Sequence, residues 1–192
     1  MSGTVERVHA STATSVTEPA AVEVLIDPPV TAGLVEDLTR LWTKVTNAGG
    51  SVGFVAPVTE ETVRPHTVSI LSRVIDGSDS LVALTEGGSV VAWCVLSSND
   101  SPPRQNWRNV RHVQVDPDCQ GSGIGGRLLQ SVEAVARGVL NLEALSLKVR
   151  TGTGAEDFYR RHGFVEVGRL PGAVKVSDTD YRDDIIMWRR LR

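Results

Sequence analysis

The strongest signal in this chain is the segment Val113-Gln114-Val115-Asp116-Pro117-Asp118-Cys119-Gln120-Gly121-Ser122-Gly123-Ile124-Gly125-Gly126. A strand-like run ends in a proline turn, four glycines follow within six positions, and an amphipathic helix begins. Glycines at a helix start leave backbone N–H groups unhindered, and the helix dipole adds about half a positive charge there. The segment therefore predicts a cradle for a phosphate or pyrophosphate.

Two other interpretations of the glycine segment are weaker. A simple strand-to-helix turn needs one or two glycines, and each further glycine costs roughly 0.5–1 kcal/mol of backbone entropy relative to alanine. The glycines at 121, 123 and 126 also match the G-x-G-x-x-G pattern of dinucleotide-binding folds. In those folds the strand runs directly into the first glycine and the next strand ends in an acidic residue. Here a five-residue turn intervenes, and the next predicted strand ends in Arg150.

The composition indicates one globular domain without a polyanionic partner. The chain has 192 residues, 41% of them hydrophobic, and a formal net charge of −3, so it can bury a core. It has no polybasic run, which argues against nucleic acid or a membrane as partner, and no apolar run approaches the roughly 20 residues of a membrane span. Cys94 and Cys119 lack metal-ligand spacing, and we expect no metal. We expect a disordered tail over residues 1–20, a folded domain over 21–192 and a cytoplasmic location.

Hydrophobic periodicity predicts a mixed α/β domain with the element order β-α-α-β-β-β-α-β-α-β-β. Thr31 and Thr59 are expected to cap the first two helices, and Pro65 is expected to break or restart the second one. Strands are expected at 22–26, 80–85, 90–96, 110–115, 145–149, 166–170 and 184–188, and the last two helices at 124–139 and 153–161.

Three blocks of the sequence resemble the GNAT superfamily of acetyl-CoA-dependent N-acetyltransferases. Residues 120–125, Gln-Gly-Ser-Gly-Ile-Gly, are similar to its pyrophosphate-binding pattern, Arg/Gln-x-x-Gly-x-Gly/Ala. Residues 158–164, Phe-Tyr-Arg-Arg-His-Gly-Phe, resemble its FYxxxGF helix and turn, and residues 186–191 resemble its last strand. Residues 49–54 and 168–172 are similar to the tabtoxin-resistance branch, whose members acetylate a small amino-bearing toxin.

The resemblance implies a GNAT-type fold: a mixed sheet of about six or seven strands flanked by about four helices, with splayed fourth and fifth strands. It implies acetyl-CoA as the co-substrate, with backbone groups of the fourth strand pairing with the pantetheine arm. An N–H group near Val115 would polarise the thioester carbonyl. The predicted cofactor-binding residues are Val113, Gln114, Val115, Gln120, Gly121, Ser122, Gly123, Ile124, Gly125, Gly126 and Arg127.

Tyr159 stands at the position where the family places its general acid. A phenol with a pKa of about 10 can protonate a thiolate whose conjugate thiol has a pKa of about 8.5. The general base has no such match, because the carboxylates of many relatives on the fourth and fifth strands are replaced here by Asn109 and Lys148. His112, His66 or a water molecule are the remaining candidates.

The resemblance implies direct acetyl transfer to the primary amine of a small molecule, such as a toxin or an antibiotic-like compound. A protein N-terminal or lysine acetyltransferase is one alternative, which predicts an open peptide groove. A non-catalytic acyl-CoA-binding regulatory module is another, motivated by the missing carboxylates. The acceptor pocket is expected where residues 49–54 meet the last hairpin, and a homodimer is common among such relatives. Four aspartates in that hairpin either attract a cationic amine or form a solvated acidic turn: Asp178, Asp180, Asp183 and Asp184.

Overall fold

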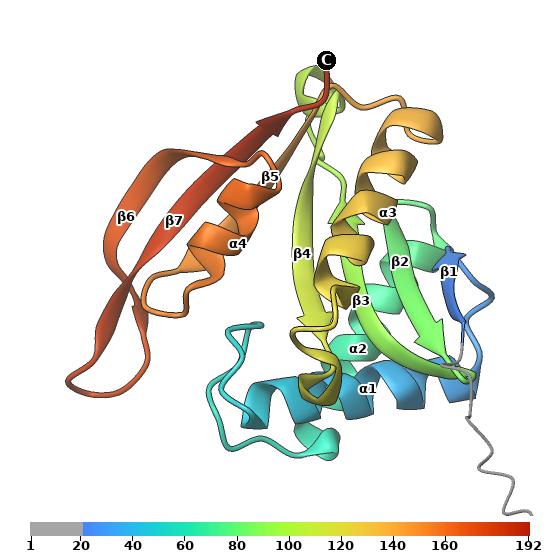
Figure 1. The fold of residues 1–192 in the computed structure, drawn as a ribbon, viewed down its shortest axis with the longest axis horizontal. Helices are drawn as coiled ribbons and strands as arrows, with labels where there is room; N and C mark the ends of the chain where they lie inside the picture. Colours follow the sequence, from blue (N-terminus) through green and yellow to red (C-terminus); the bar gives the residue numbers. More distant parts are fainter. Residues whose placement is uncertain (1–20) are drawn as a thin grey trace, which may run out of the picture.

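The computed structural model describes residues 21–192 as a seven-stranded mixed sheet with helices packed on it (Figure 1). The tail expected over residues 1–20 lies outside the described residues. The strands lie in the order β1-β2-β3-β4-β5-β7-β6. Strands β4 and β5 are parallel, whereas the other neighbouring pairs are antiparallel. This arrangement confirms the predicted GNAT-type fold.

The observed elements follow the predicted order. Helix α2 is continuous through Pro65, so the expected break there is wrong. Pro65 lies on the exposed side of the second turn, between Val63 and Thr67, whose burial holds the helix against the core. The strands are β1 Val22–Ile26, β2 Asp79–Glu86, β3 Ser89–Ser97, β4 Trp107–Val115, β5 Ala144–Arg150, β6 Val165–Lys175 and β7 Tyr181–Arg190, and the helices are α1 Ala32–Asn47, α2 Glu60–Ile75, α3 Ile124–Gly138 and α4 Ala155–Arg161.

Two hydrophobic cores lie on the two faces of the sheet. One face packs against α3 and α4, with Leu128 and Tyr159 among its buried residues. The other face packs against α1 and α2 around Trp42, and this core contains no residue of β5, β6 or β7 within the described chain. Helices α1 and α2 therefore cover only the β1–β4 half of their face, and the β6–β7 hairpin stands away from them (Figure 1).

The gap between β4 and β5 is the feature that positions the site. The two strands pair only over Trp107–Asn109 and Ala144–Ser146. Beyond these residues β4 follows β3 and β5 follows β7, which confirms the expected splay. A register shift against β3, together with a φ of 53° at His112, marks a β-bulge in β4 beside this gap.

Candidate active site

A cleft of about 470 Å³ opens where β4 and β5 diverge. It brings together Tyr159 and Val113 from the predicted site, as well as Asn109 and Lys148, the positions where relatives carry carboxylates. The last hairpin was expected to form one wall of the acceptor pocket, and this expectation is wrong. Among residues 21–192, no residue of β6 or β7 lines the cleft, although Asp184 of β7 forms a salt bridge with Lys148 on its wall. The complete lining is Ser51, Val52, Gly53, Asn109, Val110, Arg111, His112, Val113, Leu147, Lys148 and Tyr159.

The loop that follows α1 forms one wall of the cleft and is fixed to Trp42. The Trp42 indole N–H donates a hydrogen bond of 2.9 Å to the carbonyl of Val52. The ring of Phe54 packs on the same indole at 5.2 Å between ring centroids. Gly53 has a φ of 104° and lies close enough to the Trp42 ring that a Cβ would contact it at 3.7 Å. This loop is the 49–54 block found in the sequence, and its conformation depends on Trp42.

Helix α4 places Tyr159 at the inner end of the cleft. Its side chain is 9% exposed and packs edge-to-face against Phe158 and Phe164. Burial raises the pKa of the Tyr159 phenol above its ordinary value. The phenol therefore keeps its proton at neutral pH, as a general acid must.

His112 is the histidine that the structure brings into the cleft. Its imidazole lies 4.6 Å from the Trp42 ring and stacks on Trp93 at 5.9 Å. Burial, and to a smaller extent the charge of Arg111, lower its pKa to about 4, so the ring is neutral at neutral pH. His66 is exposed and packs on Phe54 outside the cleft lining. The sequence offered both histidines equally, since nothing in it marks the bulge at His112.

Within residues 21–192, the glycine segment leaves backbone donors free at the start of α3. Gly121 and Gly123 have φ values of 81° and 89°, which glycine adopts without strain. The first helical hydrogen bond runs from the Arg127 N–H to the Gly123 carbonyl at 3.0 Å. The preceding N–H groups of Ile124, Gly125 and Gly126 consequently have no acceptor within the helix. These three amides, with those of Gly121 and Gly123, form the best-placed part of the predicted cradle.

Other predicted members of the cradle are already engaged. The N–H groups of Gln120 and Ser122 donate to carbonyls of the preceding turn at 3.3 and 3.4 Å. The Arg127 guanidinium donates to the Val22 carbonyl of β1. Arg127 thus acts in the structure as a tie between α3 and β1.

The close packing of α3 on α4 explains the remaining two glycines. A Cβ on Gly125 would lie 3.3 Å from the Phe158 ring, and one on Gly126 would lie 3.2 Å from Nε2 of His162. Both contacts are tighter than side chains normally allow. The segment thus uses two glycines for backbone conformation and two for the approach of α4.

Lys44 of α1 fixes the turn before the glycine segment. Its ammonium lies 2.6 Å from the Asp116 carboxylate and 2.7 Å from that of Asp118. The same ammonium offsets two negative charges that would otherwise oppose an anion on the neighbouring cradle.

The β4 residues predicted to hold the pantetheine arm lie beside the gap. Gln114 and Val115 pair with β3 on one side, and within the described residues no strand pairs with β4 on the other side beyond Asn109. The Gln114 side chain is fully buried, and its amide atoms have no hydrogen-bond partner within the described chain. An extended ligand could therefore use only the backbone of this segment.

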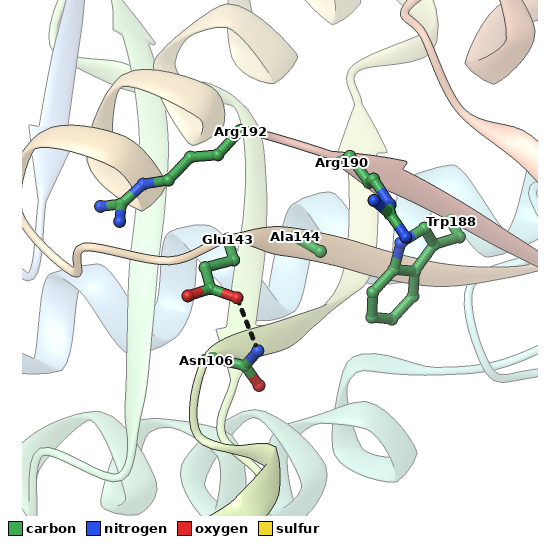
Figure 2. Close-up of a pocket in the computed structure, with 6 residues that line it drawn as sticks. All are labelled: Asn106, Glu143, Ala144, Trp188, Arg190 and Arg192. Atoms are coloured by element: carbon green, nitrogen blue, oxygen red, sulfur yellow. Dashed lines mark hydrogen bonds between the residues drawn. The ribbon is translucent and has the colours of Figure 1, made fainter.

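A second hollow of about 470 Å³ lies at the opposite end of β5 (Figure 2). Glu143 accepts a 2.9 Å hydrogen bond from Asn106 there, and Trp188 packs against Trp107 at 5.2 Å. Its lining contains no Tyr, His or Cys. The lining residues are Asn106, Glu143, Ala144, Trp188, Arg190 and Arg192.

The acidic residues of the last hairpin do not form a free anionic patch. Each one forms a salt bridge: Asp178 with Lys175, Asp180 with Arg182, Asp183 with Arg169 and Asp184 with Lys148.

In residues 21–192, no three His, Cys, Asp or Glu side chains are grouped so that they could hold a metal ion. No helix of the same residues is long and apolar enough to cross a membrane.

The model of the acetyltransferase (GNAT) family matches residues 50–164, and the chain belongs to this family of N-acetyltransferases. It is 27% identical over 110 residues to a Bacillus subtilis (strain 168) protein named "Putative phosphinothricin acetyltransferase YwnH", a match that spans 57% of this chain and 67% of the relative. It is 35% identical over 100 residues to the N-alpha-acetyltransferase RimI of Mycobacterium tuberculosis, spanning 52% of this chain and 60% of the relative.

Solved structures show the same fold at low sequence identity. A crystal structure described as "a putative phosphinothricin N-acetyltransferase" superposes with a TM-score of 0.72 at 21% identity, over 90% of this chain and 99% of that one. The structure of yncA from Salmonella typhimurium, which contains its cofactor acetyl-CoA, superposes with a TM-score of 0.70 at 16% identity, over 90% and 95% of the two chains.

Proposed function

We propose that this chain transfers the acetyl group of acetyl-CoA to the primary amine of a small molecule by direct attack. One observation supports this function above others. The cleft between β4 and β5 contains a protonated phenol, Tyr159, and a neutral imidazole, His112, beside an unpaired edge of β4. Acetyl transfer to an amine needs one group that gives a proton, one that takes a proton, and donors for the thioester.

The residues present fit acetyl-CoA. Its diphosphate would be held by the free N–H groups of Gly121, Gly123 and Ile124–Gly126, where the helix dipole adds positive potential. Lys44 neutralises the nearby carboxylates of Asp116 and Asp118. The pantetheine arm would pair with the backbone of Val113–Val115 as an added strand, and an N–H in this stretch would polarise the carbonyl.

The chemical step forms a bond from the amine nitrogen to the carbonyl carbon and breaks the carbon–sulfur bond. The Tyr159 hydroxyl donates its proton to the departing thiolate and is reprotonated from solvent. The attacking nitrogen loses a proton to His112 or, through it, to water. A group with a pKa of about 4 is a weak base, but positioning supplies much of the rate enhancement in such reactions.

Calorimetric titration with acetyl-CoA, followed by a thiol-release assay with a panel of primary amines, tests this function. We expect saturable binding, and thiol release that depends on an amine. Binding without thiol release for any amine would instead support the regulatory module.

Acetylation of a protein N-terminus is a second candidate. Within residues 21–192, the face of β5, β6 and β7 on the side of α1 and α2 has no helical cover, which would leave room for a polypeptide beside the cleft. The relative RimI is named as an N-alpha-acetyltransferase. Comparing peptide amines with free small amines in the same assay separates the two acceptor classes.

A further inference from the structure

The charge of the acceptor cleft is the reverse of what a cationic acceptor requires. Among its lining residues Arg111 and Lys148 are cationic, and none is a carboxylate. The two positions where relatives carry carboxylates contribute the amide of Asn109 and the ammonium of Lys148. A polyamine or a lysine-rich peptide would meet like charges at this cleft.

Arg111 is one of the two cations that line the cleft. Its side chain is exposed, lies directly before the bulge at His112, and forms no salt bridge within residues 21–192. Its charge reaches the interior of the cleft, because it is one of the causes that lower the pKa of His112. A guanidinium binds oxyanions with two parallel hydrogen bonds, which fixes the ligand's orientation as well as its position.

Lys148 is a second cation on the neighbouring wall. It forms a 3.2 Å salt bridge with Asp184 of β7, and its side chain remains 60% exposed. Asp184 is only 17% exposed, but an ammonium has three N–H donors, so Lys148 can contact a ligand while it keeps this salt bridge. The other hairpin aspartates bind their own cations and do not compete for Arg111 or Lys148.

We propose that the acceptor carries an anionic group, a carboxylate or a similar oxyanion, close to its amine, and that Arg111 and Lys148 bind this group. The proposal rests on the proposed acetyl transfer at the same cleft. It deepens that function by assigning the acceptor to amino-acid-like compounds rather than to polyamines or neutral amines. The bound anion would also offset the Arg111 charge beside His112 and so favour proton transfer to its imidazole.

Binding of matched acceptors tests the proposal without requiring turnover. α-Amino acids with small, aliphatic, aromatic and acidic side chains are each compared with their carboxamide and with the decarboxylated amine, by calorimetric titration into CoA-saturated enzyme. We expect the best amino acid to bind at least about tenfold more tightly than its two counterparts that lack the carboxylate, as expected for a charge-assisted contact. Arg111→Gln should remove most of this preference, and so should the double variant Lys148→Gln/Asp184→Asn, which keeps the charge balance. Lys175→Gln, which removes a cation from the distant hairpin, should leave it unchanged.

The outcomes separate the two claims. Equal or tighter binding of the carboxamides or amines, binding of no amino acid, or a preference that survives in folded Arg111→Gln would overturn the proposal. Thiol release is measured in parallel. Anion-selective binding without thiol release would contradict the proposed acetyl transfer but support the proposed anion site. Thiol release with neutral or cationic amines alone would support the proposed acetyl transfer but contradict the proposed anion site.

Discussion

The ring of Trp42 lies 4.6 Å from the imidazole of His112, so α1 contacts the bulge of β4 directly. The same indole donates its N–H to the carbonyl of Val52. One side chain therefore links three parts of the site: the first helix, the loop that walls the cleft, and the bulge that presents His112. The early part of the chain, far in sequence from the glycine segment, thereby shapes one wall of the cleft.

Replacing Trp42 with Phe should loosen the cleft wall. The variant keeps an aromatic ring beside His112 but leaves the buried Val52 carbonyl without its donor, which costs about 1–3 kcal/mol. We expect a lower free energy of unfolding in urea and a higher KM for the acceptor, with little change in the Kd of acetyl-CoA. Trp107→Phe is the matched control. Trp107 packs against Trp188 at the other end of the sheet, so this variant should leave the acceptor KM unchanged. An unchanged acceptor KM in Trp42→Phe would show that the loop is held without the indole N–H.

Replacing Tyr159 with Phe should lower kcat by about 10²–10⁴, the range for loss of a positioned acid. The ring stays in its aromatic contacts with Phe158 and Phe164, so the fold and the Kd of acetyl-CoA should be preserved. Stopped-flow thiol release and calorimetry measure the two quantities. The exposed Tyr181 provides a control, since Tyr181→Phe should change neither. Equal losses in kcat and cofactor affinity would mark Tyr159 as structural.

Replacing Gly123 with Ala should weaken acetyl-CoA binding. Gly123 caps α3 with a φ of 89°, and an L-residue there is strained by about 1–2 kcal/mol. If the backbone relaxes to relieve this strain, the free N–H groups at the start of α3 will no longer point toward one anion position. Gly138→Ala, at the other end of α3 with open space around it, is the control and should leave the Kd unchanged. Wild-type affinity in Gly123→Ala would argue against the cradle.

The fold was predictable because its signals are local. The repeat of Leu34, Leu38 and Leu41 defines α1, and Glu86-Gly87-Gly88-Ser89 defines the turn between β2 and β3. Helix α4 begins two residues later than expected, at Ala155. Gly154 adopts a left-handed conformation, and the Thr153 hydroxyl accepts from the Ala155 N–H.

The charge pattern of the site was not predictable, because it depends on strand register. Whether Asp184 is free depends on Lys148, which forms a salt bridge with it and pairs across β5 and β7 with Ile186, two residues further along β7. The hairpin β6–β7 contains two register shifts that hydrophobic alternation does not reveal. The bulge at His112 inserts a residue without a glycine to mark it. Sequence therefore predicted the turn and the start of α3 better than the charges around the cleft.

His112 should make stability depend on pH. Its pKa is about 4 in the folded protein, lowered mainly by burial, and about 6.5 in the unfolded chain. Between these values the unfolded chain binds a proton that the folded protein does not. The contribution of the neutral ring is therefore complete above pH 6.5 and is lost as the pH falls to 4, by up to about 3 kcal/mol. His112→Asn, whose side chain tolerates the left-handed backbone, should flatten urea unfolding free energies over this window, whereas the exposed His66→Asn should not. Parallel curves for wild type and His112→Asn would show that the imidazole takes up a proton as readily in the folded protein as in the unfolded chain, which would contradict the lowering of its pKa by burial.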